Sequence, residues 1–341
     1  MNLTQDKRSH PNRRKSLSLL GLILAASLLF TACGSKSYEA PFDAATTKSA
    51  FRFETANSAE TAATFASNLA VVSGDILSQA EIESGEDSYG AAIFVDTNGH
   101  NAMYARNVMS QLYPASMTKV MTALVALQNG TLDQIVTADE DCVMYENDVQ
   151  KIELRAGDSM TLDQALHILL IYSANDVAAM IAKNIGGSIE GFADMMNEEA
   201  KKIGATNSHF VNPHGLQDEN HYTTCYDMYL IFNAACQYED FKQIIAMNSY
   251  SATYQDANGN PKTFSCDNTN RFLREDSSVK APTNVTAVGG KTGTTLAAGG
   301  CLVMLSRDSR GNSYISCVMK GRSIDMTYNK TKALLSLASG E

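Results

Sequence analysis

Apolar positions near the start of the folded part of the chain change from a strand period to a helix period. Residues 91–95 and 102–106 are short apolar runs on either side of Asp96-Thr97-Asn98-Gly99, a typical turn sequence. This pattern predicts a β-hairpin. Apolar residues from 117 to 127 then repeat at helical spacing, which predicts a helix directly after the hairpin.

The rest of the chain continues this alternation. Residues 131 to about 247 have mainly helical periodicity, and residues 250–264 form two short runs around Asn-Gly, which predict a second hairpin. Strand-like runs return at 301–305 and 314–319, and a closing helix is expected at about 325–337. The order of elements indicates a mixed α/β (α+β) fold with a helical region inserted between strands.

The first 32 residues have the pattern of an export signal. Residues 1–15 are polar and basic, 17–30 are almost wholly apolar, and Thr31-Ala32-Cys33 follows. The apolar run is shorter than the roughly 20 residues that span a bilayer. Small residues before Cys33 resemble a bacterial lipoprotein cleavage box, although Phe30 is larger than usual there. Residues 1–32 are thus expected to be a signal peptide and Cys33 the lipidated first residue, with simple secretion or an uncleaved anchor as alternatives.

Residues 33–87 are rich in Ser, Ala, Thr and Glu and predict a tether. Residues 58–82 within it have enough apolar positions for a moderately amphipathic helix. Regular structure is expected to begin at Tyr89.

Charge and cysteine content limit the partners. The formal net charge is −10, and it becomes −14 without residues 1–32, which carry five basic side chains and one acidic. Such acidity argues against nucleic acid as a direct partner. The six cysteines after Cys33 lack metal-ligand spacing, so no metal site is expected. Export permits disulfides between them, whereas the apolar surroundings of four favour buried free thiols.

Candidate chemistry begins at Ser116 and Lys119, which share a face of the predicted helix. A serine hydroxyl is a poor nucleophile at neutral pH, and an amine one turn away can serve as its base if desolvation keeps that amine neutral. Alone, the pair is also compatible with a solvated serine beside a lysine.

Two further patterns follow in order. Ser173 and Asn175 stand between two apolar helical runs, where a helix cap is one reading and a site role another, and the two are compatible. Lys291-Thr292-Gly293 follows two glycines at the end of a strand-like run. The ordered set of three patterns is rare by chance.

Together these patterns resemble the serine penicillin-recognising enzymes, and within them the D-alanyl-D-alanine carboxypeptidases among the low-molecular-mass penicillin-binding proteins. The resemblance covers roughly residues 88–338, leaving 339–341 as a tail. It rests on YPASMTKVMTAL, IELRAGDSMTL, SANDVAAMIAKNIGGS, ATNSHFVNPHGL, HYTTCYDM and GGKTGTTLAAGGCLV. It implies a five-stranded antiparallel sheet with helices on both faces and a helical subdomain at about 131–250.

The resemblance also implies roles for the catalytic residues. Ser116 is expected to attack the carbonyl between the last two D-alanines of a peptidoglycan stem peptide and to form an acyl-enzyme that water hydrolyses. Lys119 is expected to be its base and Ser173 the relay of a proton to the departing amine. β-Lactams are expected to acylate Ser116, and no cofactor is required.

The substrate-binding residues implied in the same way are Asn175, Lys291, Thr292, Gly293 and Thr294. Asn175 would hold the substrate amide and orient Lys119, and Lys291 with the two threonines would bind the terminal carboxylate. Thr294 departs from the aromatic residue or histidine common after Lys-Thr-Gly.

Other candidates and rival functions are weaker. His214 and His221 flank a loop that is expected near the site, and Arg322 is either a further positive charge there or a solvated loop residue. A class A-like β-lactamase would need a Glu-x-x-Leu-Asn sequence between Asn175 and Lys291, which is absent. A non-hydrolytic lipoprotein that senses penicillin or peptidoglycan is the second alternative. Unlike many relatives, the chain ends without a C-terminal β-domain and an amphipathic anchoring helix, and a lipid on Cys33 is expected to replace that anchor. The expected location is the outer face of the bacterial cytoplasmic membrane, with the catalytic domain in the cell wall or periplasmic space.

Overall fold

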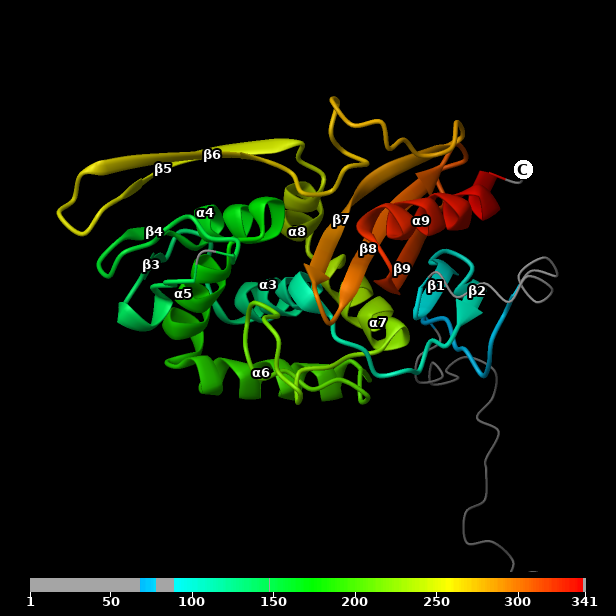
Figure 1. The fold of residues 1–341 in the computed structure, drawn as a ribbon, viewed down its shortest axis with the longest axis horizontal. Helices are drawn as coiled ribbons and strands as arrows, with labels where there is room; N and C mark the ends of the chain where they lie inside the picture. Colours follow the sequence, from blue (N-terminus) through cyan, green and yellow to red (C-terminus); the bar gives the residue numbers. More distant parts are fainter. Residues whose placement is uncertain (1–67, 78–88, 147, 340–341) are drawn as a thin grey trace, which may run out of the picture. The chain divides into compact units, whose positions relative to one another are not determined.

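The computed structural model describes residues 68–77, 89–146 and 148–339 (Figure 1). All of them belong to one compact unit, residues 64–341. The predicted signal peptide, Cys33 and most of the predicted tether lie outside the described residues. Within the described part of the chain, no helix is both long and apolar enough to cross a membrane.

The main sheet has five antiparallel strands in the order β2-β1-β9-β8-β7, which confirms the expected sheet. Their bounds are β1 Ala91–Asp96, β2 Asn101–Arg106, β7 Val285–Thr295, β8 Gly299–Asp308 and β9 Ser313–Gly321. The predicted first hairpin is therefore one edge of the sheet. Lys291-Thr292-Gly293 lies on the opposite edge strand.

Alternate residues of the central strands face two separate cores, as the period of a strand requires. Ala92 and Phe94 pack with helix α9, Ile324–Ser339, on one face of the sheet. Ile93 and Val95 belong to the larger cluster on the other face. Figure 1 shows α9, in red, lying along β8 and β9.

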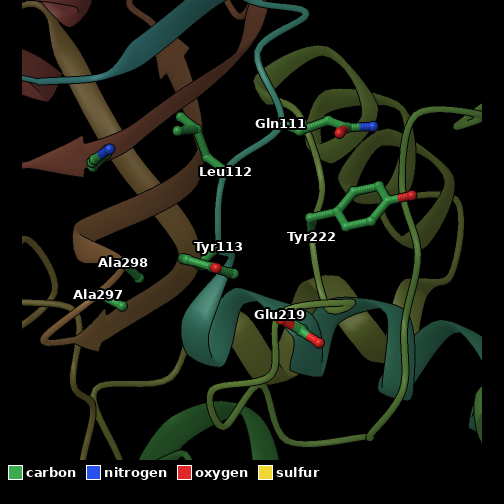
Figure 2. A pocket seen from close by; sticks show the side chains of 8 residues that line it. Gln111, Leu112, Tyr113, Glu219, Tyr222, Ala297 and Ala298 are labelled. Carbon is green, nitrogen blue, oxygen red and sulfur yellow. The ribbon is translucent and has the colours of Figure 1, made fainter. Parts of the chain in front are cut away.

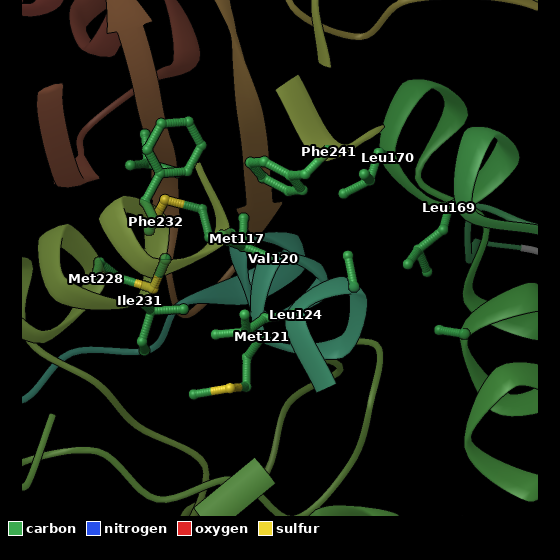
Figure 3. Packing of buried hydrophobic residues seen from close by; sticks show 14 of the residues in the cluster. Met117, Val120, Met121, Leu124, Leu169, Leu170, Met228, Ile231, Phe232 and Phe241 are labelled. Atoms are coloured by element: carbon green, nitrogen blue, oxygen red, sulfur yellow. The ribbon is translucent and has the colours of Figure 1, made fainter. Parts of the chain in front are cut away.

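The larger core surrounds helix α3, Thr118–Asn129, whose first nine residues are all buried. Around it pack α5 Asn175–Gly186, α6 Ile189–Lys202 and α7 Cys225–Ala235, and α7 also contacts the main sheet. Figure 3 shows side chains of α3 next to apolar side chains of α7 and neighbouring elements. Because the first nine residues of α3 are buried, packing around the helix positions Lys119, which lies in its first turn.

The inserted region is less purely helical than predicted. Besides α4 Leu162–His167, the π-helix η3 Ile168–Tyr172, the short 3₁₀ turn η2 Glu140–Cys142 and α8 Glu239–Ile245, it contains strands β3 Ile135–Thr137 and β4 Ser159–Thr161. These join the predicted hairpin, β5 Ser249–Gln255 and β6 Pro261–Asp267, in a second sheet. Three-residue strands are too short to show a period in sequence, which is why the prediction missed them.

Residues 68–77 correct both the predicted helix at 58–82 and the predicted start of structure at Tyr89. No residue in this stretch is helical. The buried Ala70 donates its N–H to the Tyr229 hydroxyl at 3.0 Å and accepts from the Tyr226 hydroxyl at 3.0 Å. Ile76 exchanges two backbone hydrogen bonds with Ala105 on β2. The segment lies on the domain because its backbone finds partners there, so the predicted tether does not include residues 68–77.

The six described cysteines are free thiols, and four of them are fully buried: Cys142, Cys225, Cys301 and Cys317. The sequence left open whether these cysteines form disulfides or stay free, and in the structure they are free thiols.

Candidate active site

Ser116 lies in a 3₁₀ turn, Ala115–Met117, that leads directly into α3. Its neighbour Ala115 has a φ of 48°, in the left-handed region that non-glycine residues seldom adopt. This turn leaves Ser116 partly exposed while Ala115 and Met117 are buried. Strained backbone of this kind is often retained where it presents a functional group.

Lys119 is completely buried, and its ammonium contacts three acceptors. Nζ lies 3.0 Å from Ser116 Oγ, 2.6 Å from Asn175 Oδ1 and 2.7 Å from the His214 carbonyl oxygen. Burial lowers the pKa of Lys119 well below its ordinary value, and the charge of Lys291 lowers this pKa further, whereas buried Asp176 raises it. A lysine with a lowered pKa beside a serine hydroxyl is arranged to accept its proton.

Ser173 and Asn175 lie where the π-helix η3 ends and α5 begins. Ser173 has a φ of 74°, and the residue that caps α5 is Ala174, which makes no side-chain cap bond. The capping alternative is therefore wrong. Both side chains are buried and bind lysines instead: Asn175 accepts from Lys119, and Ser173 Oγ accepts from Lys291 Nζ at 2.9 Å.

Lys291 is fully buried on β7, and its ammonium also donates to the Thr292 carbonyl at 3.0 Å. Desolvation lowers the pKa of Lys291 to about 7. The lysine lies beneath Ser173 and lines neither of the cavities next to Ser116. Its charge acts on the site through Ser173 and through the field at Lys119.

Gly293 permits β7 to approach the nucleophile. A Cβ at this position would lie 2.8 Å from the Pro114 carbonyl oxygen and 3.1 Å from the Ser116 amide nitrogen. The absence of a side chain thus brings the backbone of the edge strand against the turn that holds Ser116. Thr292 and Thr294, on either side, line the cavity beside Ser116.

Two cavities meet at Ser116, and Gln150 and Thr294 line both. The first has a volume of about 300 Å³, and we call it the carboxylate pocket after the ligand that we propose for it below. Its lining is Ser116, Gln150, Ser173, Thr269, Arg271, Thr292, Gly293, Thr294, Ile324 and Tyr328. The second, which we call the long groove, has a volume of about 560 Å³. Its lining is Ser116, Asp148, Val149, Gln150, Asn175, Gly215, Leu216, Gln217, Thr294, Thr295, Leu296 and Ala297.

Arg271 is the cation that lines the carboxylate pocket, and no short motif pointed to it. Its guanidinium pairs with Asp325 at the start of α9 and lies 5.0 Å from the centre of the Tyr328 ring. Thr269, two residues earlier, accepts a hydrogen bond from the Thr292 hydroxyl at 2.9 Å. The proposed charge at Arg322 has no such position, because Arg322 is exposed and lines neither cavity.

The two histidines have structural positions next to the site. His214 contributes its backbone carbonyl to Lys119, and burial lowers the pKa of its side chain to about 3. His221 Nε2 is 2.8 Å from the Thr118 hydroxyl, and burial lowers its pKa to about 4. Both rings are therefore neutral near pH 7. Across the described ranges, no group of His, Cys, Asp and Glu side chains is arranged to hold a metal ion.

Comparisons with known proteins agree with this geometry. The chain is 32% identical over 241 residues to the D-alanyl-D-alanine carboxypeptidase DacF of Bacillus subtilis, covering 68% of this chain and 57% of DacF. It is 31% identical to a D-alanyl-D-alanine endopeptidase of Escherichia coli, covering 67% of this chain and 68% of that protein. The crystal structure of the Streptomyces K15 DD-transpeptidase superposes with a TM-score of 0.68 at 25% identity, covering 75% of this chain and 98% of that one.

The pattern of the peptidase S11 family, described as D-alanyl-D-alanine carboxypeptidase, matches residues 76–323. This match begins before Tyr89, as the docked segment 68–77 does. The match covers well over half of the chain, and the three residue patterns with their lysine contacts lie inside it. The chain therefore belongs to the D-alanyl-D-alanine carboxypeptidase family, peptidase S11.

Proposed function

We propose that this chain is a serine D-Ala-D-Ala carboxypeptidase that removes the terminal D-alanine from peptidoglycan stem peptides. The observation that carries the proposal is the pairing of two buried lysines with two serines, Lys119 with Ser116 and Lys291 with Ser173. One pair supplies an activated nucleophile, and the other supplies a hydroxyl that can pass a proton to a leaving amine.

Acylation follows from the contacts of Lys119. When its amine is neutral, Ser116 is the partner that can donate a proton to it, because the other two partners are carbonyl oxygens. Ser116 Oγ then bonds to the scissile carbonyl carbon and its proton passes to Lys119. The backbone amides of Ser116 and Thr294 are the groups we assign to the developing oxyanion, in line with the close approach of β7 at Gly293.

Collapse of the intermediate releases D-alanine as the Ser173 hydroxyl gives its proton to the departing nitrogen. Ser173 regains a proton from the Lys291 ammonium, which donates to its Oγ. Water then hydrolyses the ester on Ser116 and frees the shortened peptide. The same nucleophile is the expected site of β-lactam acylation.

The carboxylate pocket favours a carboxypeptidase over an endopeptidase. We assign direct contact with the substrate's free carboxylate to Arg271 and to the Thr292 and Thr294 hydroxyls, with Lys291 adding charge from beneath. Charge-assisted hydrogen bonds to a carboxylate are about twice as strong as neutral ones. An endopeptidase substrate has no free carboxylate at that position.

Two other functions receive less support. A class A-like β-lactamase uses a glutamate near the nucleophile, whereas no glutamate lines either cavity among the described residues. A non-hydrolytic sensor would be acylated without turnover. The test is incubation of the full chain with a peptide that ends in D-Ala-D-Ala and measurement of free D-alanine. Repeated turnover supports the proposal, and a single stoichiometric burst would favour the sensor.

We further infer that the mature chain begins at a lipidated Cys33 and is held at the outer face of the cytoplasmic membrane. The basic start, the short apolar run and the small residues before Cys33 support this inference. Cys33→Ala should release the protein from membranes or block its processing. A variant that is processed normally and stays in the membrane fraction would rule out the lipid.

A further inference from the structure

The long groove has no role in the chemistry described so far, although it opens at the nucleophile. It continues from Ser116 between the 148–150 loop and the 215–217 loop, on the side away from Ser173. Its volume of about 560 Å³ is in the range of sites that hold small ligands. A cavity of this size next to the reacting atom can hold several residues of a peptide.

The position of Ser173 decides which half of the substrate each cavity receives. Ser173 lines the carboxylate pocket and is absent from the lining of the long groove. The leaving D-alanine must lie on the side of the proton donor, so it occupies the carboxylate pocket. The acyl part of the peptide, which stays bound to Ser116, therefore extends into the long groove.

The two cavities differ in charge. Arg271 lines the carboxylate pocket, and Asp148 is the formally charged residue in the lining of the long groove. Asp148 is exposed, and within the described part of the chain it forms no ion pair. The remaining polar side chains of this lining are amides and hydroxyls, among them Gln150 and Gln217. The site thus has a positive end and a negative end, with Ser116 between them.

We propose that Asp148 is a specificity-determining residue that binds a free amine on the side chain of the residue before D-Ala-D-Ala. This inference rests on the proposed carboxypeptidase function and names the substrate class more closely. The class is stem peptides whose third residue is a diamino acid with a side-chain amine that is not acylated and is therefore protonated. Neighbouring Cα atoms are 3.8 Å apart, so that residue lies one step along the groove from the alanine attached to Ser116. An ammonium and a carboxylate then face each other at an exposed position, where their attraction is modest and is screened by added salt.

A third cavity, of about 240 Å³, provides the internal comparison (Figure 2). It lies on the other side of Ala297, and its lining includes Tyr113, Glu219 and Lys320. Figure 2 shows Tyr113 between Ala297 and Ala298 on one side and the loop of Glu219 and Tyr222 on the other. Ser116 does not line this cavity, and its one carboxylate, Glu219, shares the lining with Lys320. Glu219 is therefore a matched carboxylate near the site but outside the groove.

The experiment compares two peptides, acetyl-lysyl-D-Ala-D-Ala with a free ε-amine and the same peptide with an acetylated ε-amine. We expect the wild-type chain to release D-alanine from the free-amine peptide with a kcat/KM about fivefold higher, and this preference to fall with added salt. Asp148→Asn should remove the preference and Asp148→Lys should reverse it. Glu219→Gln should keep it. Circular dichroism and urea unfolding of Asp148→Asn show whether the variant is folded.

Equal kcat/KM for the two peptides on the wild type, or an unchanged preference in Asp148→Asn, would overturn the inference alone. Release of D-alanine from neither peptide would overturn the proposed function together with it. A preference that disappears in Glu219→Gln would place the amine in the third cavity and also overturn the assignment to Asp148.

Discussion

Lys119 Nζ lies 3.0 Å from Ser116 Oγ, and its two other partners, the carbonyl oxygens of Asn175 and His214, carry no proton. A neutral Lys119 can therefore receive a proton from Ser116 and from neither of the others. This relationship supports the proposed roles of Lys119 as the base and Ser116 as the nucleophile.

Ser116→Ala should abolish both D-alanine release and labelling by a fluorescent penicillin, because no nucleophile remains. Mass spectrometry of the labelled wild type should place the adduct on Ser116. Ser110→Ala, an exposed serine six residues earlier, is the matched control and should be labelled at the wild-type rate. An adduct on another residue would contradict the assignment.

Lys119→Arg should lower the acylation rate by about 100- to 10,000-fold, the usual contribution of a positioned base. Arginine stays protonated and cannot accept the proton of Ser116. Stopped-flow acylation by penicillin measures the effect, and circular dichroism shows whether the variant is folded. Lys119→Met, which is uncharged, covers the case in which the buried guanidinium prevents folding. Rapid acylation of either variant would mean that another group is the base.

Lys291, which donates to Ser173, gives a prediction about how the free energy of unfolding depends on pH. The pKa of Lys291 is lowered to about 7 in the folded chain from an ordinary value of 10.5. Between these values the unfolded chain holds a proton that the folded chain has released, so the free energy of unfolding due to Lys291 rises with pH. Below about pH 7 both states are protonated, and this contribution is constant and at its lowest.

Lys291→Met should therefore gain the most stability relative to the wild type near pH 7 and progressively less toward pH 10. Urea unfolding at three pH values in this window measures the difference. Lys332→Met, at an exposed position on α9, is the control for the loss of a lysine side chain. A constant difference for Lys291→Met would mean that Lys291 stays protonated throughout.

Local sequence patterns predicted the helices and strands whose apolar residues repeat at a clear helical or strand period. The helix after Ser116 and the two runs of the first hairpin have a clear period in the sequence, and the structure has them as α3, β1 and β2. The sequence also brought Ser173 and Asn175 to notice, because two polar residues interrupt an apolar run. Their orientation toward lysines, and away from the α5 amides, depends on the π-turn before them, which no local pattern revealed.

Sequence analysis missed the cavity-lining residues that are distant from Ser116 along the chain and come close to it only in the folded structure. Arg271 and Thr269 come from the loop after β6, and Gln150 and Asp148 from an irregular loop before β4. His214 takes part through its backbone carbonyl, for which side-chain chemistry gives no signal. Residues 68–77 resemble a tether in the sequence because their partners, Tyr229 and Ala105, are distant along the chain.

Tyr229→Phe should lower the free energy of unfolding by about 1–3 kcal/mol, because it leaves the buried Ala70 N–H without its acceptor. Urea unfolding measures this loss. Tyr145→Phe removes a hydroxyl from a side chain that is 79% exposed and should change stability by less than about 0.5 kcal/mol. If the two variants lose the same amount, the segment at Ala70 is not docked as the structure has it.

Arg271 gives the prediction that separates a carboxypeptidase from an endopeptidase. The wild-type chain should cut a D-Ala-D-Ala peptide with a free carboxylate at least about tenfold faster than its C-terminal amide, since one charged hydrogen bond contributes roughly 1.5–3 kcal/mol. Arg271→Gln should bring the two kcat/KM values closer together, mainly by slowing the free acid. Steady-state release of the terminal residue from both peptides is the measurement.

Arg274 provides the matched control, because it lies three residues along the same loop, pairs with Asp276 and does not line the carboxylate pocket. Arg274→Gln should keep the full preference for the free acid, as an exposed ion pair contributes little. If instead Arg271→Gln keeps the preference and Lys291→Ala loses it, the buried lysine reads the carboxylate after a rearrangement of Ser173. Equal rates for acid and amide on the wild type would mean that neither Arg271 nor Lys291 recognises the C-terminal carboxylate. An endopeptidase would then fit the site better.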